Sequence, residues 1–292
     1  MVEHPSVSRI VFLIIAYILL SAICVVCILP LWHVIMASLS DGWQLYISDS
    51  FLVIPLSRVN FGGYGIAFGM ADVWRGYGMT ILYVVSTTLL GLFLTMCGGY
   101  YLAKKTLWQK PVGFLILMTM MFNGGLIPTY MVIRTLGLVN TPLALIIPGC
   151  TNAIFVMMAT ATFRGIPASI EEAAEMDGAG HWRMMFQISF PMAKGIMMVV
   201  AMNIVVVTWN NWFNASIYLI NGREFWPLQL VIRELMNVYS DANLARIPPA
   251  QLNEDLFTLQ YVLSVIATLP ILVACPFFQK YFGNMTVGGV KE

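Results

Sequence analysis

The sequence predicts an all-α, polytopic membrane protein with six transmembrane helices, and three observations support this class. Of its 292 residues, 59% are hydrophobic and only 10% are charged, whereas a water-soluble domain of this size exposes far more polar surface. Several apolar runs exceed the roughly 18 residues that a helix needs to cross a bilayer. The alternating ten-residue segments typical of an outer-membrane barrel are absent from the sequence.

The expected spans are separated by polar or glycine-rich segments. The first apolar run is too long for the apolar core of a cleaved signal peptide, so we expect it to remain as the first membrane helix. We divide the chain into an N-terminal span with its outer loop, residues 1–76, and a core transmembrane domain, residues 77–292. The six expected spans are residues 10–36, 77–103, 111–133, 142–163, 195–220 and 257–283.

Lysine and arginine set the expected orientation, because cytoplasmic segments carry an excess of both. With both termini in the cytoplasm, nine of these residues lie inside and six outside, and all the lysines lie inside. The inner set is Arg9, Lys104, Lys105, Lys110, Arg164, Arg183, Lys194, Lys280 and Lys291, and the outer set is Arg58, Arg75, Arg134, Arg223, Arg233 and Arg246. The outer segment from residue 40 to 75 is expected to be a solvated connection.

The sequence lacks the motifs of an enzyme or an ATPase. It has no GxxxxGK[ST] loop, so no nucleotide site is expected. The histidines are isolated, and Cys24 and Cys27 lie inside an apolar span without a nearby histidine, so no metal site is expected. There is no GxSxG nucleophile signal either. We expect a non-catalytic chain without a cofactor, which must receive energy for uphill transport from other subunits.

One long polar interruption, residues 165–194, carries a pattern rather than a simple turn. Its glutamates and alanines are good helix formers, and Ile170, Ala173, Ala174 and Asp177 share one helical face. Two alanines on that face would let another protein approach closely. Glycines at 178 and 180 then end the helix. We expect a helix, a glycine turn and a second short helix on the cytoplasmic side.

Two expected spans contain polar or helix-breaking residues. Residues 122–130 combine Asn123, two glycines and a proline with Tyr130, and broken backbone at this depth survives only where protein or a water-filled cavity satisfies it. The fifth span holds Trp209, Asn210, Asn211, Trp212 and Asn214. Aromatic faces and amides suit sugar rings and hydroxyls, although an interfacial aromatic belt with helix–helix hydrogen bonds is the alternative interpretation.

Two phrases carry a resemblance to a known family. Glu172-Ala173-Ala174, Asp177-Gly178-Ala179, Ile188 and Pro191 together resemble the EAA loop of ABC-importer permeases. Gly195 stands where that family often has a second proline. The phrase NGGLIPTYMVIRTLGLVNT, residues 123–141, resembles the complex-oligosaccharide subgroup of maltose-type carbohydrate permeases, which includes pectin- and alginate-oligosaccharide permeases.

The resemblance implies a type I ABC importer permease fold and a function in oligosaccharide import, including uronate-containing fragments such as alginate or pectin oligosaccharides. It implies a second homologous permease, two ATP-binding subunits that hold ATP and Mg²⁺, and an extracytoplasmic sugar-binding protein. It also implies the bacterial cytoplasmic (inner) membrane, contact with lipid and no nucleic acid. The expected coupling residues are Glu171, Glu172, Ala173, Ala174, Asp177, Gly178 and Phe186, and the expected substrate path is Asn123, Tyr130, Trp209, Asn210, Asn211, Trp212 and Asn214.

Three other functions are consistent with a six-span membrane protein. A permease for another solute, such as phosphate or an amino acid, is disfavoured only by the 123–141 phrase. An intramembrane enzyme would be active as an isolated chain, whereas half of a permease would not. A passive channel subunit would support transport without ATP.

Overall fold

The computed structural model describes residues 7–48, 50–122, 124–244 and 253–287, and in these residues it contains helices and no β-strand. The all-α prediction is therefore confirmed. The chain separates into two compact units, residues 1–71 with 234–268 and residues 72–233 with 269–292. The units do not follow the expected division at residue 76, because residues 234–268 belong with the N-terminal segment.

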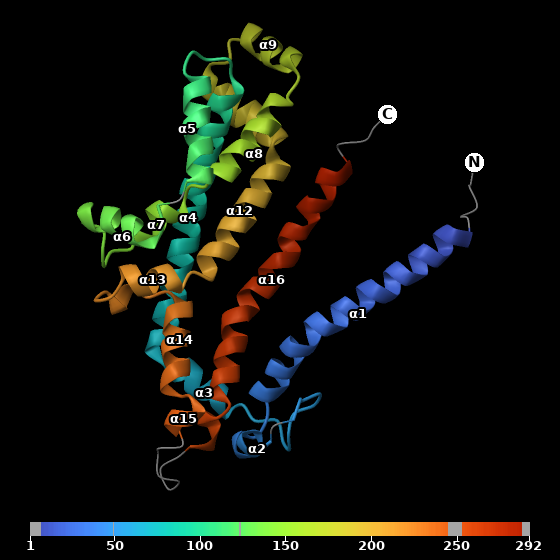
Figure 1. The fold of residues 1–292 in the computed structure, drawn as a ribbon, viewed down its shortest axis with the longest axis vertical. Helices are drawn as coiled ribbons and strands as arrows, with labels where there is room; N and C mark the ends of the chain where they lie inside the picture. The colour runs from blue at the N-terminus through green and yellow to red at the C-terminus, as the bar shows by residue number, and fades with distance from the viewer. Residues whose placement is uncertain (1–6, 49, 123, 245–252, 288–292) are drawn as a thin grey trace. The chain divides into compact units, whose positions relative to one another are not determined.

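The first unit contains one long helix and several short ones. Every large apolar side chain of α1 between Ile10 and Trp32 is exposed within the chain, and such a surface is stable only against lipid or another apolar surface. Figure 1 shows α1 as an uninterrupted blue helix, although Pro30 lies inside it. The elements of this unit are α1 (Val7–Ser38), α2 (Gly42–Ile47), α3 (Gly62–Gly69), α15 (Asp241–Leu244) and η4 (Glu254–Leu256).

The segment after α1 folds into short helices, and many of its residues between α2 and α3 are exposed. Asp41 caps α2 by accepting the Gln44 N–H at 3.1 Å. The Asn60 amide donates to the Asp255 carboxylate at 2.6 Å. A Cβ at Gly62 would lie 2.1 Å from that carboxylate, so this close approach requires glycine. The short helices α2 and α3 thus both pack against the η4 turn.

The second unit holds most of the apolar helices. α5 and α12 both pack against α8, and α13 packs against α7. α14 (Leu228–Val238) and α16 (Leu259–Val287) each contribute residues to both units. The remaining elements are α4 (Ala71–Ala103), α5 (Gln109–Met121), α6 (Leu126–Thr135), α7 (Leu143–Gly149), α8 (Ala153–Arg164), α9 (Ala168–Met176), α10 (His181–Arg183), η1 (Met184–Ser189), α11 (Phe190–Met192), α12 (Lys194–Trp209), α13 (Phe213–Tyr218) and η2 (Arg223–Phe225).

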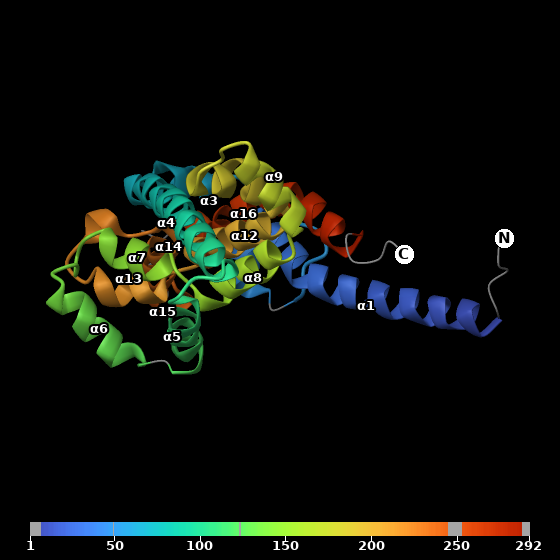
Figure 2. The same cartoon turned by 90° about the horizontal axis from the view of Figure 1, so that it is seen from above.

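The spans differ in how continuous they are. Three stretches are long and apolar enough to cross a membrane, Ser8–Ser38, Ala71–Ala103 and Asp255–Ala274, and the number reaches five among the described residues if each of two bent helix pairs forms one span. The pairs are α7 with α8, bent by 42°, and the helix His181–Met192 with α12, bent by 83°. The predicted span 111–133 corresponds to α5 and α6, which leave their break in different directions (Figure 1 and Figure 2).

Small residues on α4 allow its neighbours to come close. A Cβ at Gly99 would lie 2.6 Å from the Cβ of Ala159 on α8. A Cβ at Gly91 would lie 2.6 Å from the carbonyl oxygen of Cys150. Since membrane helices associate through van der Waals packing rather than through the hydrophobic effect, such close contacts contribute much of their stability.

We predict that Gly99→Ala lowers the stability of the protein, whereas Gly78→Ala on the same helix does not. The added methyl at Gly99 must displace the α8 backbone, and overpacking of this kind costs about 1–3 kcal/mol. At Gly78 no atom lies within 4 Å of the position that a Cβ would take, and alanine is the better helix former. Thermal unfolding of the two purified variants in detergent measures the difference. Equal melting temperatures would contradict this packing.

Candidate functional site

A cavity of about 470 Å³ in the second unit lies where three breaks between helices meet. Its lining includes residues from the breaks between α6 and the preceding α5, between α7 and α8, and between α12 and α13. The lining residues are Gly125, Leu126, Thr129, Ala144, Leu145, Pro148, Gly149, Thr151, Asn152, Phe155, Asn203, Ile204, Val207, Thr208, Asn211, Asn214 and Tyr218. Irregular backbone is thus concentrated at one polar cavity.

The first break precedes α6. Gly125 has a φ of +82°, a left-handed conformation that favours glycine. The Gly125 carbonyl oxygen accepts both the Thr129 N–H at 3.3 Å and the Thr129 hydroxyl at 2.7 Å. Gly125 and Thr129 both line the cavity.

The second break separates α7 from α8. Pro148 lies near the end of α7, and Asn152 caps α8 by accepting the Ile154 N–H at 2.9 Å. Asn152 and Thr151 line the cavity with Gly149. The second break therefore directs polar backbone and side-chain groups toward the same cavity as the first break.

The third break lies between α12 and α13. α12 ends at Trp209, and α13 begins at Phe213. Asn211 lies in the break and Asn214 in the first turn of α13, and both line the cavity. Thr208 and Asn203 reach it from α12. The cavity can therefore offer four amide side chains, those of Asn152, Asn203, Asn211 and Asn214.

The other residues of the expected substrate path lie outside this lining. Trp209 is buried with its ring 6.2 Å from that of Tyr77. The Asn210 amide donates to the Val206 carbonyl oxygen of its own helix. The guanidinium of Arg233 lies 3.5 Å from the centre of the Trp212 ring. These contacts point to roles in supporting the cavity wall.

Tyr130 packs in the hydrophobic cluster around Tyr83, Ile133 and Tyr218. Its ring stacks on that of Tyr218, a residue that does line the cavity, with centroids 6.3 Å apart. Tyr130 thus lies one residue away from the lining. Asn123, the remaining residue of the expected path, lies outside the described residues.

Sequence reasoning missed the contribution of the fourth span and of α12. Thr151, Asn152 and Asn203 line the cavity but carry no family motif. The signal for the second break was present in Pro148-Gly149-Cys150-Thr151-Asn152, which combines a helix breaker with a favourable N-cap residue. Asn203 alone, inside an apolar helix, would have indicated a polar surface nearby.

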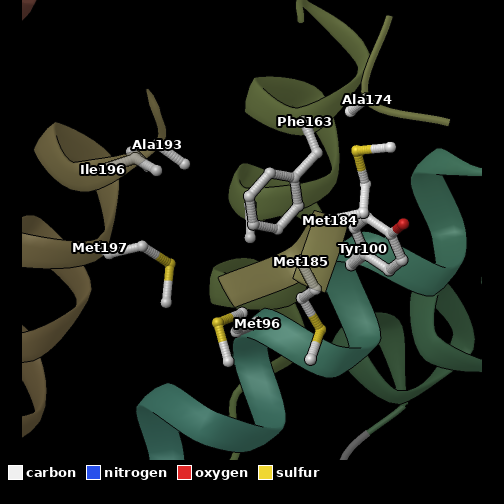
Figure 3. Packing of buried hydrophobic residues seen from close by; sticks show 10 residues of the cluster. Met96, Tyr100, Phe163, Ala174, Met184, Met185, Ala193, Ile196 and Met197 are labelled. Atoms are coloured by element: carbon white, nitrogen blue, oxygen red, sulfur yellow. The ribbon is translucent and has the colours of Figure 1, made fainter. Parts of the chain in front are cut away.

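A second candidate site is the surface formed by α9 and the helix from His181 to Met192. Figure 1 shows α9 beyond the ends of α5 and α8. Ala174 of α9 inserts into a hydrophobic cluster with Phe163, Met184 and Tyr100 (Figure 3). The full cluster is Met96, Tyr100, Ala159, Phe163, Ala174, Met184, Met185, Ala193, Ile196 and Met197. Ala174 therefore anchors α9 in this cluster, whose other members come from α4, α8, η1 and the start of α12.

The glycine turn after α9 has the geometry of a Schellman motif. The Gly178 N–H donates to the Glu175 carbonyl oxygen at 3.0 Å, and the Ala179 N–H donates to the Ala174 carbonyl oxygen at 2.9 Å. Gly178 has a φ of +76°, which L-residues with a side chain rarely adopt. The predicted helix, glycine turn and second helix are all present.

The expected coupling residues divide into buried and exposed sets. Ala174 faces the interior, so only Ala173 of the two alanines is available to a partner, which corrects the expectation of a two-alanine face. Glu171 forms an ion pair with Lys104, at the end of α4, at 2.5 Å. The exposed set is Glu172, Ala173, Asp177, Gly178 and Phe186.

Two exposed residues in this region were not expected. Met176 is 89% exposed at the end of α9, and Trp182 is 64% exposed in the second helix. The Trp182 ring stacks on that of Phe186, with centroids 5.9 Å apart and planes at 14°. A mixed surface of exposed apolar side chains and carboxylates is typical of a protein–protein contact. In the sequence, the positions of Met176 and Trp182 beside Gly178 and Gly180 could have indicated that both side chains are exposed.

None of the protein-family models compared with the chain matches it. The chain is 30% identical to the polygalacturonan/rhamnogalacturonan transport system permease protein YtcP of Bacillus subtilis (strain 168), over 91% of this chain and 93% of that protein. It is 31% identical to protein LplC of the same organism, over 99% of this chain and 97% of that protein.

A solved structure is also similar. The chain superposes with a TM-score of 0.85 and 26% identity on a chain from the crystal structure of a bacterial ABC transporter involved in the import of the acidic polysaccharide alginate, covering 96% of this chain and 99% of that one. The fold is therefore that of a type I ABC importer permease, a non-catalytic membrane subunit. The chain belongs to the family of permease subunits of ABC sugar transporters.

We predict that Gly178→Val opens the end of α9, whereas Gly180→Val leaves it intact. A side chain in the left-handed conformation costs roughly 1–2 kcal/mol, while Gly180 has a φ of −72° and open space around it. Hydrogen exchange followed by mass spectrometry should show faster exchange of the Gly178 and Ala179 amides only in the first variant. Equal protection in both variants would contradict the assigned turn.

Proposed function

We propose that this chain forms, together with a second permease of the same family, the translocation path of an ATP-driven importer for acidic oligosaccharides. The observation that carries the proposal is the convergence of three helix breaks on one polar cavity. In transporters, broken helices place polar backbone groups at the substrate site near the middle of the membrane. The amides and hydroxyls of the cavity supply the matching side chains.

The chemistry of the cavity suits sugar hydroxyls. An asparagine amide both donates and accepts, and a threonine hydroxyl does the same. Phe155 and Tyr218 add aromatic surface for the C–H faces of a sugar ring. The lining residues include neither lysine nor arginine. We therefore assign the binding of hydroxyls to this chain and the binding of carboxylates to cationic groups of another subunit.

The class of substrate rests on the relatives. One has a name that refers to polygalacturonan and rhamnogalacturonan, and the similar solved structure belongs to a transporter for alginate. Polygalacturonan and alginate are both polymers of uronic acids. An oligosaccharide rich in uronate is therefore the proposed substrate, delivered by an extracytoplasmic sugar-binding protein.

The α9 surface is the proposed docking site for a cytosolic ATP-binding subunit. Glu172 and Asp177 can pair with basic residues of that subunit, and Met176, Trp182 and Phe186 can insert into an apolar depression. Two such subunits would bind ATP and Mg²⁺. This arrangement places both termini of the chain in the cytoplasm of a bacterium and its apolar helices in the inner membrane.

Energy would pass from the docking surface to the cavity through packed helices. Ala174 anchors α9 in the cluster around Phe163 and Met184, to which α4, α8 and α12 also contribute residues. α8 begins at one of the breaks that line the cavity, and α12 ends at another. A displacement of α9 when the ATP-binding subunits close therefore tilts elements that carry Asn152 and Asn211, and alternating access follows.

We predict that Asn211→Ala and Asn214→Ala raise the concentration of trigalacturonate needed for half-maximal uptake, by up to about tenfold each, because each removes a hydrogen-bonding group worth roughly 0.5–1.5 kcal/mol. Uptake is measured in proteoliposomes that contain the whole importer. Asn210→Ala is the matched control, because the Asn210 amide bonds to its own helix.

The two substrate assignments can fail separately. If both asparagine variants need the same trigalacturonate concentration for half-maximal uptake as the unchanged protein, this cavity is not part of the translocation path. Uptake of a neutral arabinotriose with no uptake of trigalacturonate would leave the path in place and overturn the acidic substrate.

We predict that Trp182→Ser lowers sugar-stimulated ATP hydrolysis by at least about fivefold, since truncating an aromatic anchor at an interface typically costs more than 1 kcal/mol. Trp108→Ser, which removes a tryptophan of similar exposure outside the α9 surface, should leave hydrolysis unchanged. Co-purification of the ATP-binding subunits reports assembly. Full hydrolysis in the Trp182 variant would exclude this side chain from the contact.

A further inference from the structure

A second, larger cavity lies between the α4–α5 turn and the start of α9. Its volume is about 1150 Å³, and it opens among charged residues. Four cations and two carboxylates line it, which leaves an excess of two positive charges. The charged lining residues are Lys104, Lys105, Lys110, Arg164, Glu171 and Glu175. The translocation path does not use this cavity.

Part of this positive charge is uncompensated by carboxylates of the described residues. Lys104 pairs with Glu171, whereas the ion pairs of the described residues include neither Lys105 nor Lys110. Arg164 donates to the Leu102 carbonyl oxygen at 3.0 Å and so directs its guanidinium at backbone rather than at an acid. The Gln109 amide donates to the same oxygen at 2.9 Å. An anion in this cavity would find several donors already in position.

An apolar groove continues from the charged cavity. It has a volume of about 290 Å³ and shares Gln109, Lys110 and Arg164 with the larger cavity. Its other lining residues are Leu102, Gly113, Phe114, Leu117, Met157 and Thr160, from α4, α5 and α8. α5 has no buried residue, so its surface beside the groove is available to a ligand with an apolar part.

The position of the two cavities matches the boundary of a membrane. Lys104 directly follows the apolar helix α4, and Arg164 is the last residue of α8. Basic residues at the ends of membrane helices lie at the level of lipid headgroups, and basic pockets between such helices bind anionic headgroups. A free phosphate would satisfy the cations but would leave the adjoining groove without an occupant.

We propose that the two cavities together form a binding site for one anionic phospholipid. The phosphate lies among Lys105, Lys110 and Arg164, and an acyl chain lies in the groove between α5 and α8. Because Glu171 of α9 lines the charged part, the bound headgroup also contacts the element that carries the coupling surface. The anionic lipid is therefore a structural component of that surface.

Native mass spectrometry of the whole importer, purified with its partner subunits, tests the proposal with phosphatidylglycerol as the probe. Lys105→Gln with Lys110→Gln should weaken phosphatidylglycerol binding roughly 25-fold, since each cation near a membrane surface contributes about fivefold. Arg183→Gln with Lys194→Gln removes the same charge outside the cavity and should have no effect. Phosphatidylcholine should bind weakly to every variant.

A further variant separates a lipid from a free phosphate. A Cβ at Gly113 would lie 3.7 Å from Leu102, an ordinary contact, so Gly113→Leu should fill the groove without disturbing the backbone. It should weaken phosphatidylglycerol binding at least tenfold. Binding of phosphatidylglycerol unaffected by Gly113→Leu but displaced by inorganic phosphate would overturn the lipid in favour of a phosphate site. Equal binding of both lipids, or no effect of the lysine substitutions, would also overturn the proposal.

Discussion

The need to satisfy backbone hydrogen bonds inside a membrane governs this structure. A continuous helix satisfies them internally, and α4 does so over 33 residues. Elsewhere the chain breaks its helices, and three breaks border the same cavity. At the second break the Asn152 side chain caps α8 by accepting the Ile154 N–H. The polar site is thus a direct result of where helices are interrupted.

The surface around α9 uses the opposite arrangement. There two hydrogen bonds of the turn close the end of α9, and a glycine in the left-handed conformation ends the helix sharply. One face of α9 is buried through Ala174, and Glu171 forms an ion pair with Lys104. The remaining face presents carboxylates beside exposed Met176 and Trp182. Such a surface is anchored in the chain's own core on one side and exposed on the other.

The sequence predicted the uninterrupted helices to within a few residues, because long apolar runs determine them. It also indicated the break near Gly125, whereas it treated residues 195–220 as one span and missed the break after Trp209. It did not place the tryptophans of the fifth span. Helical spacing put Trp209 and Trp212 on one side, but the chain leaves the helix between them, so Trp209 meets Tyr77 and Trp212 meets Arg233. Periodicity cannot predict directions across a break, nor which face of α9 its neighbours bury.

The length of α4 has a mechanical consequence. At 1.5 Å per residue it extends about 50 Å, with Lys104 beyond one end and the Tyr83 hydroxyl donating to the Phe225 carbonyl oxygen in its other half. Its glycines let α8 and the Cys150 turn lie against it. A rod of this length that turns about one of these contacts displaces its two ends in opposite directions.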